Sequence, residues 1–172
     1  MRRLYLLRHA QAAPAQNTED RHRPLTSDGV ATAAALGRVM KAKGYIPDFI
    51  ICSPARRTRQ TLQKILDTTG EIPAVFPPAA YYTTVGQLYE MLKQIDGNYQ
   101  SVLLVSHNPS IHALGKFLMG LGPGEIVSRL NMDYKEATLT VLDCPIDGWA
   151  TLMPNENDLE DLLIPGKDFN PA

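Results

Sequence analysis

The sequence lacks the features of several protein classes. Its formal net charge is −1, so the chain as a whole has no positive field that would attract nucleic acid or an anionic membrane. No apolar run approaches the roughly 20 residues needed to cross a bilayer, and the N-terminus lacks the pattern of a signal peptide. Two cysteines, Cys52 and Cys144, are too few for a disulfide scaffold. We therefore expect a cytoplasmic protein that binds neither nucleic acid nor membrane.

The hydrophobic residues that are present predict an α/β fold. The chain has 172 residues, 44% of them hydrophobic, which suits a single domain over residues 1–172. Short apolar runs alternate with stretches of helical periodicity, and this predicts a mostly parallel sheet in a three-layer α/β/α sandwich. Residues 155–172 are polar and marked by proline, so we expect a C-terminal flap or tail there.

The expected strands cover residues 4–7, 49–52, 74–76 and 101–105, and residues 137–142 and 149–153 are expected to form a terminal hairpin. The expected helices begin after an N-cap at Thr26, at Pro54 after an N-cap at Ser53, near residue 88, and at Pro109. The first of these helices should end near Gly44, where glycine is a common stop signal.

Basic side chains follow three of the expected strands. Arg8 and His9 come directly after the first strand, Arg57 lies in the first turns after the second, and His107 follows the strand at 101–105. Carboxyl ends of parallel strands share one edge of a sheet, where helices begin with free backbone N–H groups. The sequence therefore predicts that two arginines and two histidines meet in one anion pocket.

This set of side chains suits phosphoryl transfer. Arginine makes bidentate contacts to phosphoryl oxygens, and a neutral imidazole can attack phosphorus to form an intermediate that water later hydrolyses. We expect His9 to be the nucleophile, with Arg8, Arg57 and His107 holding the phosphoryl group. We expect no metal, since His107 and His112 are five residues apart with no supporting carboxylate. The proposed chemistry also requires no cofactor.

Four segments resemble, in order, the motifs of the histidine phosphatase superfamily, which includes the cofactor-dependent phosphoglycerate mutases. They are an Arg-His pair in residues 7–12, Arg-Pro-Leu-Thr in 23–29, a Ser-Pro segment with arginines in 53–61, and Ser-His-Asn-Pro in 105–109. The resemblance implies a phosphoglycerate mutase-like fold. It also implies that the phosphate ligand is Arg57, four residues after Ser53, rather than Arg56. Arg23 and Asn108 are expected as further substrate-binding residues.

The short chain and its Arg-Pro-Leu-Thr segment are most similar to the small bacterial SixA type. That similarity implies a phosphohistidine substrate on a phosphotransfer domain of a two-component relay. The sequence departs from the family's pattern in two ways: Ala10 stands where glycine is usual, and residues 80–84 hold no carboxylate to protonate an alcohol leaving group. Because imidazole is expelled more easily than an alkoxide, the missing acid favours phosphohistidine over a phosphate ester.

Two other functions remain open. The same pocket could serve small phosphate esters or phosphoserine and phosphothreonine, so the partner is a phosphorylated protein or a small phosphorylated metabolite. A carboxylate within reach of the leaving group would favour the ester. A non-catalytic phosphate-binding module is the other alternative. Among the remaining candidates, His22 and His112 are expected to be structural or exposed, Arg56 and Arg59 to be solvated, and Cys52 to be a core thiol.

Overall fold

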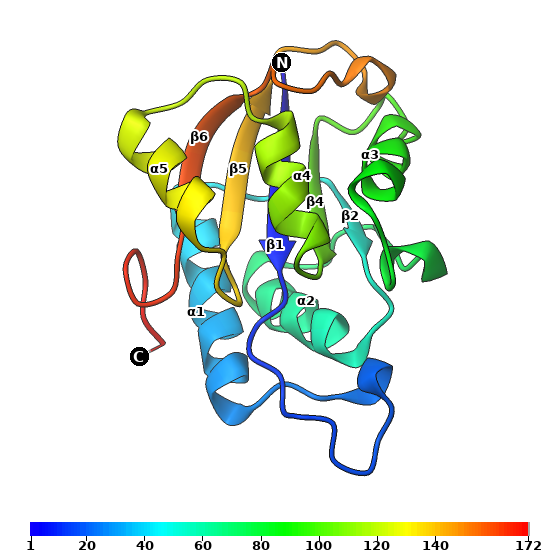
Figure 1. Cartoon of the computed structure of the whole chain (residues 1–172), viewed down its shortest axis with the longest axis vertical. Helices are drawn as coiled ribbons and strands as arrows, with labels where there is room; N and C mark the ends of the chain where they lie inside the picture. The colour runs from blue at the N-terminus through cyan, green and yellow to red at the C-terminus, as the bar shows by residue number, and fades with distance from the viewer. Residues whose placement is uncertain (172) are drawn as a thin grey trace.

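The computed structural model describes residues 1–171, which form a six-stranded sheet with helices on both faces (Figure 1). The strand order is β3-β2-β4-β1-β5-β6. Pairing between β1, β2, β3 and β4 is parallel, whereas β5 is antiparallel to both of its neighbours. The strands are β1 (Arg2–Arg8), β2 (Phe49–Cys52), β3 (Ala74–Val75), β4 (Ser101–Ser106), β5 (Leu139–Cys144) and β6 (Asp158–Leu163).

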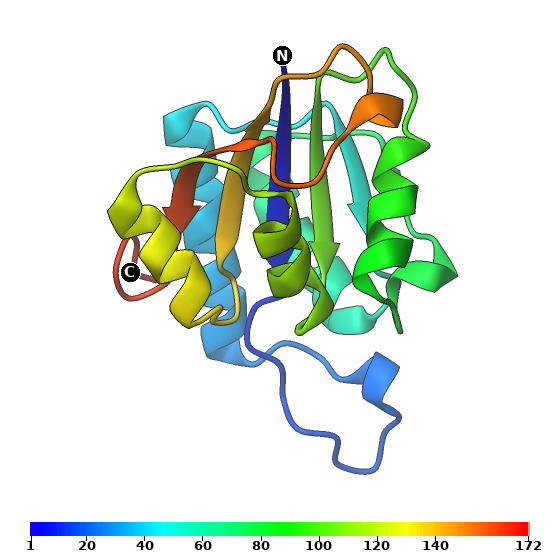
Figure 2. The same ribbon diagram turned by 45° about the horizontal axis from the view of Figure 1, so that its top comes forward.

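The helices complete the predicted three-layer sandwich. Helices α1 (Ser27–Lys43) and α2 (Arg56–Thr69) cover one face of the sheet, and α3 (Val85–Lys93), α4 (Ser110–Leu118) and α5 (Gly124–Met132) cover the other (Figures 1 and 2). The central strand β1 is buried on both sides, as expected for a parallel strand between two helical layers. Its side chains alternate between two cores: Leu4 and Leu6 pack with α3 and α4, while Tyr5 and Leu7 pack with α1 and α2.

The sequence signals for helix α1 are confirmed at both ends. The Thr26 hydroxyl accepts a hydrogen bond from the Gly29 backbone N–H at 2.9 Å, which caps the helix. Gly44 ends it in the left-handed conformation with φ of 71°. The start of α2 differs from the prediction. Ser53 and Pro54 precede the helix, which begins at Arg56, and this leaves the Ser53 hydroxyl free for another contact.

The C-terminal prediction is wrong in its pairing. The partner of β5 is β6, and Trp149–Thr151 forms a short 3₁₀ helix instead of a strand. The Trp149 ring is fully buried in the core beside α3 and α4. The expected flap or tail at 155–172 is therefore corrected for the described residues 155–171, because Asp158–Leu163 completes the edge of the central sheet.

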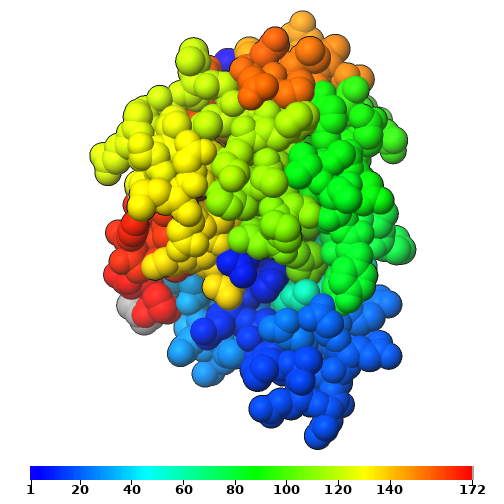
Figure 3. Space-filling model, in the orientation of Figure 1, coloured from blue at the N-terminus to red at the C-terminus, as the bar shows by residue number. Residues whose placement is uncertain are grey.

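An excursion between β1 and α1 extends past the carboxyl ends of the parallel strands. It contains a 3₁₀ helix, Asp20–His22, and forms the lower end of the molecule in Figures 2 and 3, where it is blue. None of the residues in that 3₁₀ helix is buried. This segment comprises residues 13–23.

Within the described residues, no helix is both long and apolar enough to cross a membrane.

Gly29 holds the start of this excursion close to α1. A Cβ at this position would lie 2.1 Å from the Gln11 carbonyl oxygen, which accepts a hydrogen bond from the Thr26 N–H at 3.0 Å. We expect Gly29→Ala to lower the free energy of unfolding by about 1–3 kcal/mol, because the backbone must shift to relieve the overlap. Urea denaturation measures the change. Gly86→Ala in α3 is the control, since its Cβ would meet nothing closer than 4.0 Å, and similar losses in both variants would contradict this explanation.

Candidate active site

Strand register brings three strand ends together. Arg8 at the end of β1 lies opposite Ser106 at the end of β4, and the His9 N–H donates to the Ser106 carbonyl at 3.2 Å. On the other side of β4, the Ser53 N–H donates to the Val105 carbonyl at 2.9 Å. The two residues that follow β1 and β4 are therefore neighbours, and the ring centroids of His9 and His107 are 5.2 Å apart.

His9 is held as a neutral imidazole. Its side chain is buried, and Nδ1 lies 2.7 Å from the Ala10 carbonyl oxygen. A carbonyl only accepts, so Nδ1 carries the proton and Nε2 keeps its lone pair. The pKa of His9 is lowered to about 4, mainly by burial and also by the positive charges of Arg57 and Arg8, which together outweigh the opposite effect of the hydrogen bond to Ala10. At neutral pH the ring is therefore uncharged, with Nε2 available to attack an electrophile.

His107 is also neutral in the structure. Arg57 Nη2 lies 3.2 Å from His107 Nδ1, and because arginine only donates, Nδ1 must accept. The proton is then on Nε2, which donates to the Ser53 hydroxyl at 2.7 Å. The pKa of His107 is lowered to about 3, mainly by burial, and the neighbouring His9 and Arg57 act in the same direction. Ser53, which the sequence suggested as a helix cap, instead fixes the orientation of this ring.

The two arginines keep part of their hydrogen-bonding capacity. Arg8 donates from Nη1 to the Tyr134 carbonyl at 2.7 Å and lies 3.5 Å from a Glu136 carboxylate oxygen. Arg57 is 6% exposed, and its two Nη atoms contact Asp20. Both Nε atoms are buried without a hydrogen-bond partner among the described residues. Unpaired buried donors are uncommon, so these atoms are suited to meet an anion.

The structure shows which arginine near the start of α2 belongs to the site, a choice that the sequence could make only from the distance to Ser53. Arg57 lies in the pocket, whereas Arg56 and Arg59 are exposed. Arg23 is less direct: it donates to the Ala13 carbonyl and, at 3.0 Å, to Asp20 Oδ1, so it reaches the site through Asp20. Asn108 lines the pocket and donates to the Tyr134 carbonyl at 3.1 Å.

Sequence reasoning missed Asp20, which lies at the site. Its carboxylate accepts hydrogen bonds from Tyr81 at 2.5 Å, Arg23 at 3.0 Å and Arg57 at 3.1 Å. The Tyr81 hydrogen bond, with those of Arg23 and Arg57, lowers the pKa of Asp20 to about 2, so the group is ionised at neutral pH. The partners Arg57 and Tyr81 are 37 and 61 positions away in the chain, and local spacing does not reveal such contacts.

A pocket of about 180 Å³ opens beside these groups. The exposed Tyr82 ring lies against Tyr81 at its mouth, with centroids 4.2 Å apart. The residues around the pocket are Arg57, Tyr81, Tyr82, Thr83, His107, Asn108, Pro109 and Ser110. Within residues 1–171, no three His, Cys, Asp or Glu side chains are grouped so that they could hold a metal ion.

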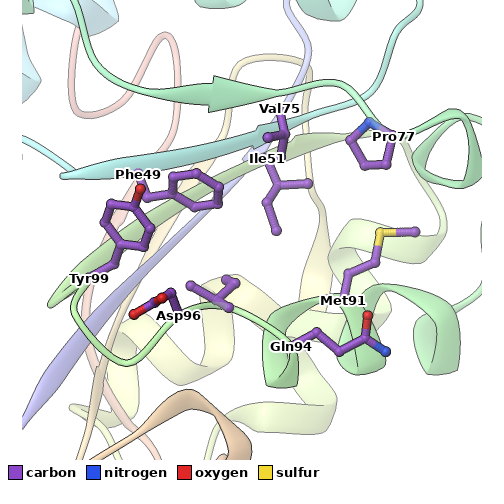
Figure 4. Close-up of a pocket in the computed structure, with 9 residues that line it drawn as sticks. Phe49, Ile51, Val75, Pro77, Met91, Gln94, Asp96 and Tyr99 are labelled. Carbon is purple, nitrogen blue, oxygen red and sulfur yellow. The ribbon is translucent and has the colours of Figure 1, made fainter.

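A second pocket, of about 330 Å³, lies between α3 and strands β2 and β3 (Figure 4). Its walls are mainly apolar and include Phe49, Ile51 and Met91. None of its lining residues belongs to the histidine and arginine site, so we do not assign it a part in the chemistry.

The low histidine pKa values predict that acid destabilises the fold. An unfolded histidine titrates near pH 6.5, whereas folded His9 titrates near 4, so between these values the unfolded chain binds more protons. Stability is therefore lost as the pH falls through this window, by about 1–2 kcal/mol for His9 between pH 7 and 5. Urea denaturation at both pH values measures the loss. It should be smaller in His9→Ala, and an equal loss would contradict the assignment.

The sequence and the structure are similar to those of known proteins. Residues 4–80 match the model of the histidine phosphatase superfamily (branch 1). A proposed phosphohistidine phosphatase SixA from Agrobacterium tumefaciens is 30% identical, with a TM-score of 0.80 over 95% of this chain and 98% of that chain. A corresponding protein from Nakamurella multipartitia is 29% identical, with a TM-score of 0.79 over 95% of each chain. An uncharacterised Picosynechococcus protein is 30% identical over 75% of this chain and 78% of its own length.

Proposed function

Because this chain belongs to the histidine phosphatase superfamily, we propose that it is a phosphatase in which His9 accepts the phosphoryl group of the substrate. The observation that carries the proposal is the hydrogen bond from His9 Nδ1 to the Ala10 carbonyl, which leaves Nε2 as the attacking atom. His9 combines a fixed tautomer, a neutral ring and the nearby positive charges of two arginines. This combination suits a nucleophile that must be uncharged before it attacks an anionic phosphoryl group.

The reaction has two steps. In the first, Nε2 of His9 forms a bond to phosphorus while the bond from phosphorus to the leaving group breaks; the leaving group keeps the electron pair and takes a proton from solvent water. In the second, water attacks phosphorus in line, the bond between phosphorus and Nε2 breaks with its electron pair returning to Nε2, and the attacking water gives up a proton to solvent, which releases inorganic phosphate and restores His9. Arg8 and Arg57 hold the non-bridging oxygens in both steps, and their partnerless Nε–H groups provide donors for them.

His107 has a role that changes with the charge in the pocket. In the structure its neutral Nδ1 accepts from Arg57, and positive neighbours contribute to its low pKa. A bound phosphoryl dianion would oppose those positive charges and raise the pKa of His107. The ring would then turn from an acceptor for Arg57 into a charged donor to phosphoryl oxygen, with its Nε2–H still directed at Ser53.

We further propose that the phosphoryl group is carried by a histidine on a protein, such as a phosphotransfer domain. The similar proteins from Agrobacterium and Nakamurella are each described as a proposed phosphohistidine phosphatase SixA, and this similarity supports the same substrate here. Asp20 is a carboxylate beside the pocket, the feature that would favour an ester. Its pKa of about 2, however, leaves it without a proton to donate at neutral pH. An imidazole leaving group depends less on such a donor than an alkoxide does.

The test compares phosphate release from three kinds of substrate at equal concentration. They are a phosphotransfer domain labelled on histidine, a phosphoserine peptide and a panel of sugar phosphates, with His9→Ala as the blank. We expect the phosphohistidine protein to be hydrolysed preferentially. Preference for the esters would overturn the proposed substrate while leaving His9 as nucleophile, and phosphate binding without turnover of any substrate would favour a binding module.

A further inference from the structure

Asp20 occupies both terminal nitrogens of Arg57, one with its backbone carbonyl and the other with its carboxylate. Arg57 Nη1 donates to the Asp20 carbonyl at 2.8 Å, and Nη2 donates to Asp20 Oδ2 at 3.1 Å. The same Nη2 is within 3.2 Å of His107 Nδ1, so Asp20 contacts Arg57 on the side that faces the second histidine. The two terminal nitrogens of an arginine are the atoms that bind a phosphate in bidentate fashion.

From this geometry we propose that Asp20 competes with the phosphoryl group for Arg57, so that substrate binding displaces the Asp20 carboxylate from Arg57. The inference rests on the proposed function, because it takes Arg57 to be a phosphate ligand. The site already contains an anion, the Asp20 carboxylate, and a ligand must bind Arg57 more tightly than this carboxylate does. A dianionic phosphoryl group meets that condition more readily than a singly charged anion.

The remaining contacts of Asp20 show where the carboxylate can go. Tyr81 donates to Oδ2 and Arg23 donates to Oδ1, and neither bond involves Arg57. Arg23 is tied in turn to the Ala13 carbonyl at 2.7 Å, within the same loop. If the Asp20–Arg57 pair opens, Arg23 and Tyr81 still neutralise and hydrogen-bond the carboxylate, which lowers the cost of the exchange.

Burial also favours an exchange. The Asp20 side chain is 39% exposed, whereas that of Arg57 is 8% exposed. Solvent screens the partly exposed carboxylate and so weakens its attraction to Arg57. The 3₁₀ helix that carries Asp20 buries no residue, so the loop can move without opening either core. Arg57 therefore stays fixed on α2 while its anionic partner changes.

The experiment measures the dissociation constant of inorganic phosphate by isothermal titration calorimetry for the full chain and its variants. Asp20→Asn keeps the size of the side chain and removes its charge, and we expect it to bind phosphate about three- to fivefold more tightly than the wild type. Tyr81→Phe removes one of the two donors that hold the displaced carboxylate, so we expect it to weaken phosphate binding, in the opposite direction to Asp20→Asn. Asp67→Asn is the matched control, because Asp67 is an exposed carboxylate paired with Lys64 outside the pocket.

Arg57→Ala separates this inference from the proposed function. We expect it to weaken phosphate binding in the wild type and to abolish the gain in the Asp20→Asn background. If wild-type binding does not depend on Arg57, the phosphate site is misplaced and the proposed function fails together with this inference. If binding depends on Arg57 but Asp20→Asn binds no more tightly, or more weakly, only the competition is overturned, and Asp20 then serves to position Arg57.

Discussion

Replacing His9 by alanine is expected to lower kcat/KM by a factor on the order of 10⁴ or more and to leave no phosphorylated intermediate. The site would retain Arg8, Arg57 and His107, so substrate binding should persist at a reduced level. What is lost is the one atom, Nε2, that the Ala10 carbonyl contact leaves free for attack. Rapid quenching with labelled substrate and detection of acid-labile, base-stable phosphate on the protein measures the intermediate.

Two controls sharpen this test. Free imidazole added to His9→Ala should restore part of the turnover, because it fits the space of the missing ring and can accept the phosphoryl group itself. The product released would then be phosphoimidazole, which separates this path from direct attack by water. His22→Ala is the matched variant, since His22 has a 60% exposed side chain outside the pocket. Full activity of His9→Ala would refute the proposed nucleophile.

Replacing Arg57 by alanine is expected to lower kcat by about 10²–10³-fold, the usual cost of one preorganised donor to a developing charge. Arg57 is buried, and its position on α2 leaves its Nε–H without a partner among the described residues. Arg57→Lys keeps the charge but loses the planar fork, so we expect an activity between those of the alanine variant and the wild type. Steady-state kinetics of the two variants and the wild type with the same substrate give the kcat values to compare.

Arg56 supplies the matched control for Arg57, because it is the adjacent residue and is exposed. Arg56→Ala should leave kcat within about twofold of the wild type, as surface substitutions away from a site do. The opposite pattern, with a large loss in Arg56→Ala and none in Arg57→Ala, would show that the register on α2 has been assigned wrongly.

The central part of the fold could be predicted because its apolar signals are local. Strands β1, β2 and β4 are short continuous apolar runs, and parallel pairing places their carboxyl ends at one edge. Arg8, His9 and His107 directly follow such runs, so their convergence required only the choice of a parallel sheet. Arg57 needed the family motif as well, since three arginines lie within four residues of each other.

The C-terminal strand could not be predicted because it breaks the alternation on which strand prediction depends. β6 has three acidic residues among six, and its pairing with β5 shifts register between Val141 and Leu142. The extra residue on β6 lets Leu159 and Leu162, three positions apart, pack into the same core cluster. Residues 149–153 gave the opposite error: they were expected to form a strand, but Trp149–Thr151 is a 3₁₀ helix from which the Trp149 indole N–H donates to the Tyr99 carbonyl.

The position of β1 in the sheet has a consequence for how the protein reaches its native state. This strand precedes the others along the chain, yet it pairs with β4 on one side and β5 on the other. A growing chain therefore exposes an apolar strand with no partner until α1, α2 and α3 have been synthesised, and Arg8 lacks its Tyr134 carbonyl for longer still. Pairing between segments far apart in the chain slows folding. The residues at the end of β1, although synthesised first, therefore reach their native contacts last.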